Sequence, residues 1–201
     1  MGSYVNILGI DFSKLNLKET VELIDTKISE GSNRIFHLIT VNPEIAVQIQ
    51  EDPELKKISL GADLITPDGV GIVWASRLKG NSVPERVTGY DLLLETIKVG
   101  NQKGWSFYLL GSDEEVNMKA SENIRISNPD ILIVALGSPL ADKWIYSHKN
   151  DINHKVVCGV GGSLDVITGK VKRTPEILKK LNIEWLHRRI TQPLCSVLKY
   201  V

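Results

Sequence analysis

Short apolar runs that alternate with helix-like stretches are the feature that most restricts the fold of this chain. Five β-branched runs are each followed by a turn residue and then by helix-like sequence. These candidate strands are 34–40, 63–66, 105–110, 131–136 and 155–159. Four of them are nearly uninterrupted apolar runs, as is typical of strands covered on both faces. We therefore predict an α/β, Rossmann-like fold with a mainly parallel sheet and helices on both faces.

Periodicity and capping residues predict where helices begin. Leu17–Ile28 has apolar residues at positions 17, 21, 24 and 28, the spacing of one helical face. Asn42-Pro43-Glu44 combines a capping residue, a first-turn proline and an acidic residue, and Thr174-Pro175-Glu176 repeats that signal. No repeat, low-complexity tract or linker interrupts the 201 residues. We predict a single domain over 1–201, with a basic helical segment at 174–201.

The charge of the chain is unevenly distributed. The net charge is formally zero, but residues 170–201 hold eight basic and two acidic residues, so this end carries +6 and the rest −6. Such asymmetry indicates an anionic partner, namely a membrane surface, a diphosphate or a nucleic acid, or alternatively a solvated helical face. Aromatic residues are not interleaved with the basic ones, so nucleic-acid binding is not expected.

Several other classes of protein are disfavoured. No apolar run approaches the roughly 20 residues that span a bilayer, and the N-terminus lacks the pattern of a secretory signal. The two cysteines, Cys158 and Cys195, form no disulfide framework and suit a reducing compartment. Cys158 lies in an apolar run, which favours a buried strand thiol over a nucleophile. The four histidines share no metal-ligand spacing, so no zinc site is expected.

Polar residues and glycines follow each predicted strand. They are Thr40-Val41-Asn42, Pro67-Asp68-Gly69, Gly111-Ser112, Gly137-Ser138 and Gly159-Val160-Gly161-Gly162. In open parallel sheets, ligands bind outside the carboxyl ends of the strands, where the loops converge. We therefore expect these five segments to gather along one edge of the sheet and to form a site there.

Each candidate residue in these segments also has a structural interpretation. Asp68 could act as a general base if burial raises its pKa from about 3.9, or it could cap a helix that begins near Gly69. Arg86 could bind a diphosphate, or it could pair with a neighbouring acid at the surface. The glycines after 159 could cradle a phosphate or form a tight turn, and Asp165 could hold a ribose, cap a helix or face solvent. Leu164 occupies the third glycine position of the dinucleotide fingerprint.

A divalent metal is not expected at this site. Many sugar-nucleotide transferases hold a divalent ion with an Asp-x-Asp pair, and the sequence contains no such pair. The leaving diphosphate would then be stabilised by Arg86, by backbone amides or by a helix N-terminus. We therefore expect metal-independent chemistry with no cofactor beyond the donor substrate.

Taken together, these segments resemble the WecG/TagA/CpsF glycosyltransferases over nearly the whole chain and in order. The matching stretches are 40–44, 62–71, 85–91, 129–139, 159–165, 169–175 and 184–186. The resemblance implies an inverting transfer of N-acetylmannosamine from UDP-N-acetylmannosamine to undecaprenyl-diphosphate-linked N-acetylglucosamine. The product would carry a β-1,4 link and serve teichoic acid or surface polysaccharide synthesis.

The resemblance also implies roles for individual residues. Asp68 would deprotonate the acceptor hydroxyl, and Thr40 would help to position the sugar or the acceptor. Asn42 and Arg86 would contact the diphosphate. The nucleotide would be bound by the remaining matched positions, with the ribose on the acidic residue: Gly137, Gly161, Gly162 and Asp165.

Two positions depart from the family pattern. Ile126 runs directly into Ser127, where family members have a longer stretch that includes an aromatic-bearing loop near the nucleotide. Ala141-Asp142 stands where the family usually has Gln-Glu, and since that glutamine is thought to face the site, reduced activity is one expected consequence. The basic C-terminal appendage of the family supports membrane association and would be cut short at Val201. We expect a cytoplasmic protein, peripheral on the inner face of the cell membrane.

Two other function classes stay open at this point. A nicotinamide-dependent Rossmann oxidoreductase is weakened by the broken glycine fingerprint and by the lack of a ribose-binding acid on the next strand. A non-catalytic UDP-sugar-binding module is favoured by the short 126–127 junction and by Ala141. The sequence does not fix the oligomeric state, although a homo-oligomer could order the C-terminal helix.

Overall fold

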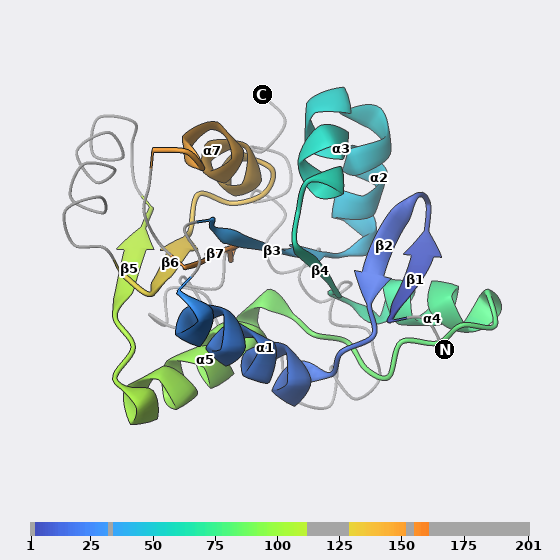
Figure 1. Ribbon diagram of the computed structural model, residues 1–201. Coiled ribbons are helices and arrows are strands. Elements are labelled where there is room, and N and C mark those ends of the chain that lie inside the picture. Colours follow the sequence, from blue (N-terminus) through green and yellow to red (C-terminus); the bar gives the residue numbers. More distant parts are fainter. Residues whose placement is uncertain (1–2, 32–33, 112–128, 152–154, 161–201) are drawn as a thin grey trace, which may run out of the picture. The chain divides into compact units, whose positions relative to one another are not determined.

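The computed structural model describes residues 3–31, 34–111, 129–151 and 155–160 (Figure 1). The chain divides into two compact units, Met1–Leu164 and Asp165–Val201, and every described residue belongs to the first. The helix predicted at Thr174, the basic segment 174–201 and Cys195 lie outside the described residues.

Five parallel strands form the central sheet of this unit. They run in the order β4-β3-β7-β6-β5, and all four pairings are parallel. Their bounds are β3 (Phe36–Val41), β4 (Leu64–Pro67), β5 (Phe107–Leu110), β6 (Ile131–Val134) and β7 (Val156–Gly159). Every strand overlaps a predicted one. The α/β, Rossmann-like fold is thus confirmed.

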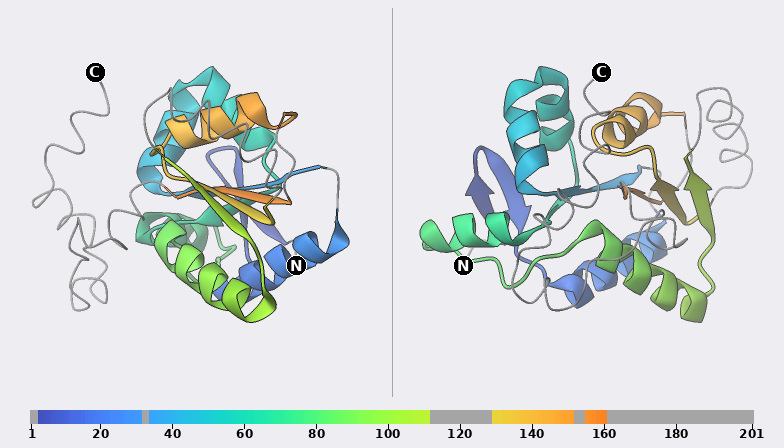
Figure 2. Two further views of the ribbon diagram at one scale, coloured as in Figure 1. Left: turned by 90° about the vertical axis from the view of Figure 1, so that its left-hand side faces the viewer. Right: turned by 180° about the vertical axis from the view of Figure 1, so that it is seen from behind.

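Helices cover both faces of the sheet (Figures 1 and 2). One face carries α1 (Leu17–Glu30) and α5 (Gly89–Lys103), whereas the other carries α2 (Pro43–Glu51), α3 (Pro53–Leu60) and α7 (Leu140–His148). Successive side chains of β3 pack against helices on opposite faces of the sheet. Leu38 packs with α1 and α5, and Ile39 packs with α2 and α3. None of the helices in the described ranges has the length and apolar character needed to cross a bilayer.

The helix starts follow their capping chemistry. The α1 helix begins after Asn16, which forms a capping box with Glu19, and it ends at Gly31 in the left-handed conformation, with a φ of 63°. The α2 helix begins at Pro43, with Asn42 as its N-cap. Both the periodic stretch from Leu17 and the Asn-Pro-Glu signal are therefore confirmed as helices.

An antiparallel hairpin precedes the first helix, and it was not predicted from the sequence. It pairs β1 (Tyr4–Ile7) with β2 (Ile10–Ser13) through a two-residue turn. Leu8 and Gly9 both have positive φ, 53° and 75°, as in the turns that match the twist of short hairpins. The hairpin buries one side, including Val5 and Phe12, in a hydrophobic cluster with α2, α3 and α4 (Val70–Leu78).

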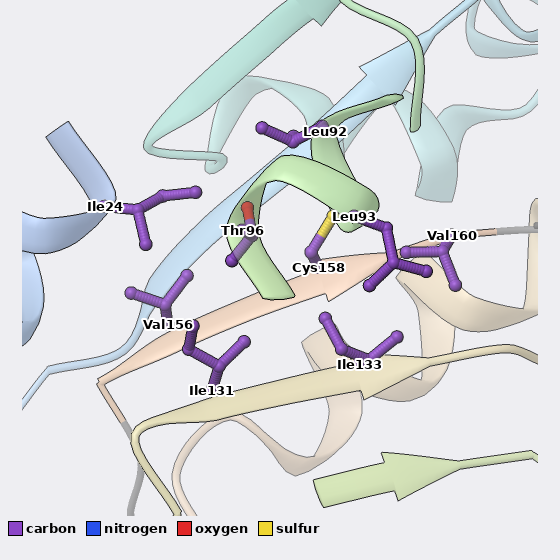
Figure 3. Close-up of a pocket in the computed structure, with 9 residues that line it drawn as sticks. All are labelled: Ile24, Leu92, Leu93, Thr96, Ile131, Ile133, Val156, Cys158 and Val160. Carbon is purple, nitrogen blue, oxygen red and sulfur yellow. The ribbon is translucent and has the colours of Figure 1, made fainter. Parts of the chain in front are cut away.

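A small apolar cavity of about 10 Å³ lies between α1, α5 and the sheet (Figure 3). This volume is at most that of one water molecule, and the lining is apolar apart from Thr96 and Cys158, so the cavity is a packing void and no ligand site. Burial raises the pKa of the Cys158 thiol to about 12, and the nearby Asp142 carboxylate adds to the rise. Cys158 is therefore a buried strand thiol, as predicted, and not a reactive thiolate.

Replacing Thr96 by valine should leave the free energy of unfolding unchanged or raise it by up to about 1 kcal/mol. The Thr96 hydroxyl oxygen is buried without a hydrogen-bond partner, so the substitution removes an unsatisfied polar atom and keeps the shape of the side chain. Urea unfolding followed by circular dichroism measures the change. Thr66→Val is the matched control, because its buried hydroxyl donates to the Val87 carbonyl at 3.3 Å, and it should be destabilising. Equal losses in both variants would contradict the prediction.

Candidate active site

The carboxyl ends of β3 and β4 form the edge at which the candidate residues gather. Val41 pairs with Pro67 in the parallel register, so Asn42 and Asp68 are the next residues on neighbouring strands. After β3 the chain continues into α2 on one face of the sheet, whereas after β4 it leads through α4 to α5 on the opposite face (Figure 1). Ligands of open α/β sheets bind where neighbouring connections leave on opposite faces. This strand pair is therefore the topological place for a site.

Asp68 is held at this edge by contacts from two elements. Its backbone N–H donates to the Val41 carbonyl at 3.0 Å, and its Oδ2 accepts from the Gly89 N–H at 3.3 Å. Gly89 is the first residue of the 15-residue helix α5, so the carboxylate lies at the positive end of a helix dipole. The N-cap of α4 is Gly69, and no side-chain cap hydrogen bond is present there. The Asp68 carboxylate thus contacts the start of α5, which begins 21 residues further along the chain.

The segment that precedes α5 is fastened to β4. The Val87 N–H donates to the Pro67 carbonyl at 2.8 Å, and the Thr66 hydroxyl donates to the Val87 carbonyl at 3.3 Å. Both Thr66 and Val87 are fully buried. Because these bonds join the residues next to Asp68 and Gly89, they set the separation between the carboxylate and the start of α5. Sequence reasoning assigned no role to Thr66, Val87 or Gly89.

Arg86 and Thr40 border the same cluster. Arg86 is half-buried and directly precedes Val87. Because the Val87 N–H donates to the Pro67 carbonyl, the backbone of Arg86 lies near the carboxyl end of β4. Thr40 is half-buried and lies on the face of β3 that meets α5. A methyl group on Gly89 would lie only 3.1 Å from the Thr40 hydroxyl oxygen, so α5 begins in close contact with this threonine. Thr40 and Asp68 thus lie at one edge of the sheet, as expected from the topology of the strands, and the backbone of Arg86 reaches the same edge through Val87.

Glu85 makes a structural contact that could not be predicted from the sequence. Its Oε1 accepts from the Leu17 N–H at 2.7 Å, which ties the segment before α5 to the first turn of α1. The Asp91 carboxylate accepts from the Thr88 hydroxyl at 2.8 Å, and Thr88 in turn caps α5. Glu85 and Asp91, the acids nearest to Arg86 in the sequence, thus anchor the two ends of the segment that carries the guanidinium.

Asn42 lies at the junction of two helix N-termini. Its Oδ1 accepts from the Ile45 N–H at 2.8 Å as the cap of α2. The cap uses the amide oxygen of Asn42. A diphosphate at this edge would therefore face the N–H₂ group, which is a hydrogen-bond donor. Pro43 adjoins the start of α4, since a methyl group built on Gly71 would lie 2.7 Å from the Pro43 Cγ. Gly69 has a φ of 99°, a conformation that favours glycine.

Of the other predicted site residues, the structure describes Gly137. Gly137 follows β6 with a φ of 78°, and β7 separates β6 from β3. Gly161, Gly162 and Asp165 lie outside the described residues, so their roles stay predictions. Within the described ranges, no group of three His, Cys, Asp or Glu side chains is placed to hold a metal ion.

The two residues that depart from the family pattern are both buried. Ala141 is 1% exposed and lies against the end of β7, where a methyl group on Gly159 would be 3.2 Å from its Cβ. Asp142 is also buried, with its Oδ1 3.6 Å from the His37 Nε2. In this chain, position 141 thus contributes to the core beneath the strand end.

The sequence is similar to those of known glycosyltransferases. The model of the glycosyl transferase WecG/TagA/CpsF family matches residues 5–127 and 119–201, and the two matches meet around the short 126–127 junction. An N-acetylglucosaminyldiphosphoundecaprenol N-acetyl-beta-D-mannosaminyltransferase of Staphylococcus aureus strain MRSA252 is 31% identical, over 92% of this chain and 84% of the relative. The protein of the same name from strain NCTC 8325 / PS 47 is 30% identical over the same shares. This chain belongs to the WecG/TagA/CpsF family of glycosyltransferases.

Proposed function

We propose that this protein transfers N-acetylmannosamine from UDP-N-acetylmannosamine to N-acetylglucosamine linked through a diphosphate to undecaprenol, forming a β-1,4 link. The observation that carries the proposal is the Asp68 carboxylate, positioned by the Gly89 N–H at the β3–β4 edge in a family of glycosyltransferases. The sugar and the acceptor come from the names of the Staphylococcus aureus relatives. Membership of this family does not favour an oxidoreductase.

Asp68 is the general base of the proposed reaction. Its carboxylate removes the proton from the acceptor hydroxyl as that oxygen attacks the anomeric carbon of the donor. The bond between this carbon and the β-phosphate oxygen breaks, and UDP leaves with the electron pair. A single displacement of this kind inverts the configuration at the anomeric carbon. Thr40, which lies next to the start of α5, orients the acceptor sugar in the proposed reaction.

The leaving diphosphate is proposed to be stabilised by protein groups alone. Arg86 offers a guanidinium from the segment fastened to β4, and Asn42 offers amide donors at the start of α2. The N-terminus of α4 lies beside them, because Pro43 packs on Gly71, and a helix N-terminus attracts anions through its backbone N–H groups. These groups supply positive charge where negative charge develops during departure.

The protein is proposed to act at the inner face of the cytoplasmic membrane. The lipid-linked acceptor named for the relatives resides in a membrane, and residues 170–201 carry a charge of +6 that suits anionic lipid. The binding site for the nucleotide would be completed by Gly137, Gly161, Gly162 and Asp165, as the family resemblance implies.

A transfer assay with the full chain tests the proposal. UDP-N-acetylmannosamine is incubated with a short-chain lipid-diphosphate N-acetylglucosamine, and the disaccharide product is resolved by chromatography and its linkage determined by NMR. We expect turnover that persists in EDTA and is much slower with UDP-N-acetylglucosamine as donor. Binding of UDP without any turnover would instead indicate a non-catalytic module, and turnover that stops in EDTA would refute metal independence.

A further inference from the structure

Helix α4 presents an apolar stripe that begins beside the candidate base. Its buried side consists of Ile72, Val73 and Ser76. On the opposite side, Trp74 is 55% exposed and Leu78 is 90% exposed, and they follow Val70 at intervals of four residues. Two large apolar side chains exposed on one stripe form a contiguous patch, and the largest apolar patch of a folded unit is often functional.

The charged residues of helix α4 and its C-cap are all basic. Residues 69–84 contain Arg77 and Lys79 and no acidic residue, although residues 1–169 as a whole carry −6. Both cations are exposed. The Lys79 ammonium donates to the Asn6 carbonyl of β1 at 3.0 Å, which holds the end of α4 against the hairpin. The helix thus combines a fixed position with an apolar and cationic outer face.

The stripe also has a definite place relative to the site. Asp68 directly precedes the N-cap of α4, and at about 1.5 Å per residue Trp74 and Leu78 lie about 9 and 15 Å further along the chain direction of the helix. A lipid-linked acceptor places one sugar ring and a diphosphate between its reacting hydroxyl and its lipid. The stripe therefore lies at a distance from the base where the lipid and the bilayer surface would begin.

We infer that the α4 stripe of Val70, Trp74 and Leu78, with Arg77 and Lys79, is a docking surface for an anionic bilayer. Tryptophan prefers the interface between headgroups and acyl chains, and basic residues beside it interact with anionic lipid. The inference deepens the proposed function, on which its choice of a membrane as the partner rests. It assigns membrane contact to described residues next to the site, in addition to the basic segment beyond residue 169.

A second copy of the chain is the less favoured occupant. Trp74 and Leu78 together expose on the order of 300 Å², whereas a stable interface buries about 800 Å² per partner. The cations on the stripe would also meet their own copies across a two-fold axis. Binding to a bilayer does not require a protein interface of this area, and anionic lipid attracts the two basic side chains.

Flotation of the full chain with vesicles tests the inference without any substrate. We expect the protein to float with phosphatidylglycerol vesicles more than with phosphatidylcholine vesicles, and Trp74→Ser/Leu78→Ser to lower the partition coefficient by about tenfold or more. Leu60→Ser is the matched control, because Leu60 is 72% exposed at the end of α3, and it should float like the unaltered chain. Brominated lipid should quench tryptophan fluorescence in the unaltered chain and less in Trp74→Phe.

Transfer assays separate this inference from the proposed function. The double variant should keep its rate with the short-chain acceptor in solution and lose rate with the acceptor embedded in vesicles. Flotation of the double variant at the level of the unaltered chain, or no flotation of either, would overturn the docking surface even if transfer is observed. Loss of a dimer in sedimentation, with vesicle binding unchanged, would assign the stripe to a second copy instead.

Discussion

Replacing Asp68 by asparagine should lower kcat for sugar transfer by about 10²–10⁴-fold while the UDP-sugar still binds. The substitution removes the group that accepts the acceptor proton, but its amide oxygen can still accept from the Gly89 N–H, as Oδ2 does at 3.3 Å. The fold and the start of α5 should therefore persist. Steady-state kinetics of transfer, together with calorimetric titration of UDP, measures both parts of the prediction.

The matched control for this prediction is Asp63→Asn. Asp63 directly precedes β4, so it lies at the opposite end of the same strand, where its Oδ2 accepts from the His37 N–H at 3.0 Å. This variant should keep kcat within a few-fold even if its thermal stability falls. Unaltered kcat in Asp68→Asn would remove the assignment of this residue as the base, and a comparable loss in Asp63→Asn would attribute the effect to strand packing.

Replacing Gly71 by alanine should reduce both stability and transfer. A helical Gly→Ala change ordinarily stabilises by about 0.5–1 kcal/mol, but the new methyl group would lie 2.7 Å from the Pro43 Cγ, closer than carbon atoms approach. This steric clash can be relieved only if the N-termini of α2 and α4 move apart. Overpacking of this kind costs about 1–3 kcal/mol, so the net effect is destabilising. Because Asn42 and Asp68 adjoin these two helix starts, transfer should slow as well.

Urea unfolding and transfer rates, measured on the same preparations, check this second prediction. Gly61→Ala is the matched control, since its nearest neighbour would be the Lys57 carbonyl at an ordinary 3.5 Å, and it should change neither quantity appreciably. Pro43→Ala should restore part of the loss in the Gly71→Ala background, because it removes the ring atom that clashes. Additive losses in this double-mutant cycle would show that the two residues do not interact and would count against the clash.

The sheet was predictable because its strands are buried on both faces. A strand such as β6 must be apolar at every position, and its four residues are all buried, so the run is visible without knowledge of its neighbours. The starts of α1 and α2 were predictable for a related reason. Their caps are satisfied by residues three positions away, as when Asn42 accepts from the Ile45 N–H, so the whole interaction is contained in a short segment.

The hairpin was missed because its strands have only four residues each and alternate between buried and exposed positions. So short an alternation is a weak signal, and its burial depends on α2, α3 and α4, which come later in the chain. The same reasoning applies to Asp68. Its side chain accepts a hydrogen bond from the Gly89 N–H, 21 residues away, and no local pattern reveals that contact.

The sequence by itself determined the class of fold, the approximate positions of the five central strands and the family, because apolar periodicity and matched motifs are properties of continuous segments. Only the tertiary structure decided how these segments form a site. The fastening of Val87 to β4 by Pro67 and Thr66, the contact of Gly89 with Thr40, and the packing of Pro43 on Gly71 each join residues that are distant in the chain. Such contacts depend on the parallel pairing of β3 with β4, which brings Asn42 and Asp68 side by side, and that pairing follows from the packing of the whole sheet rather than from either strand alone.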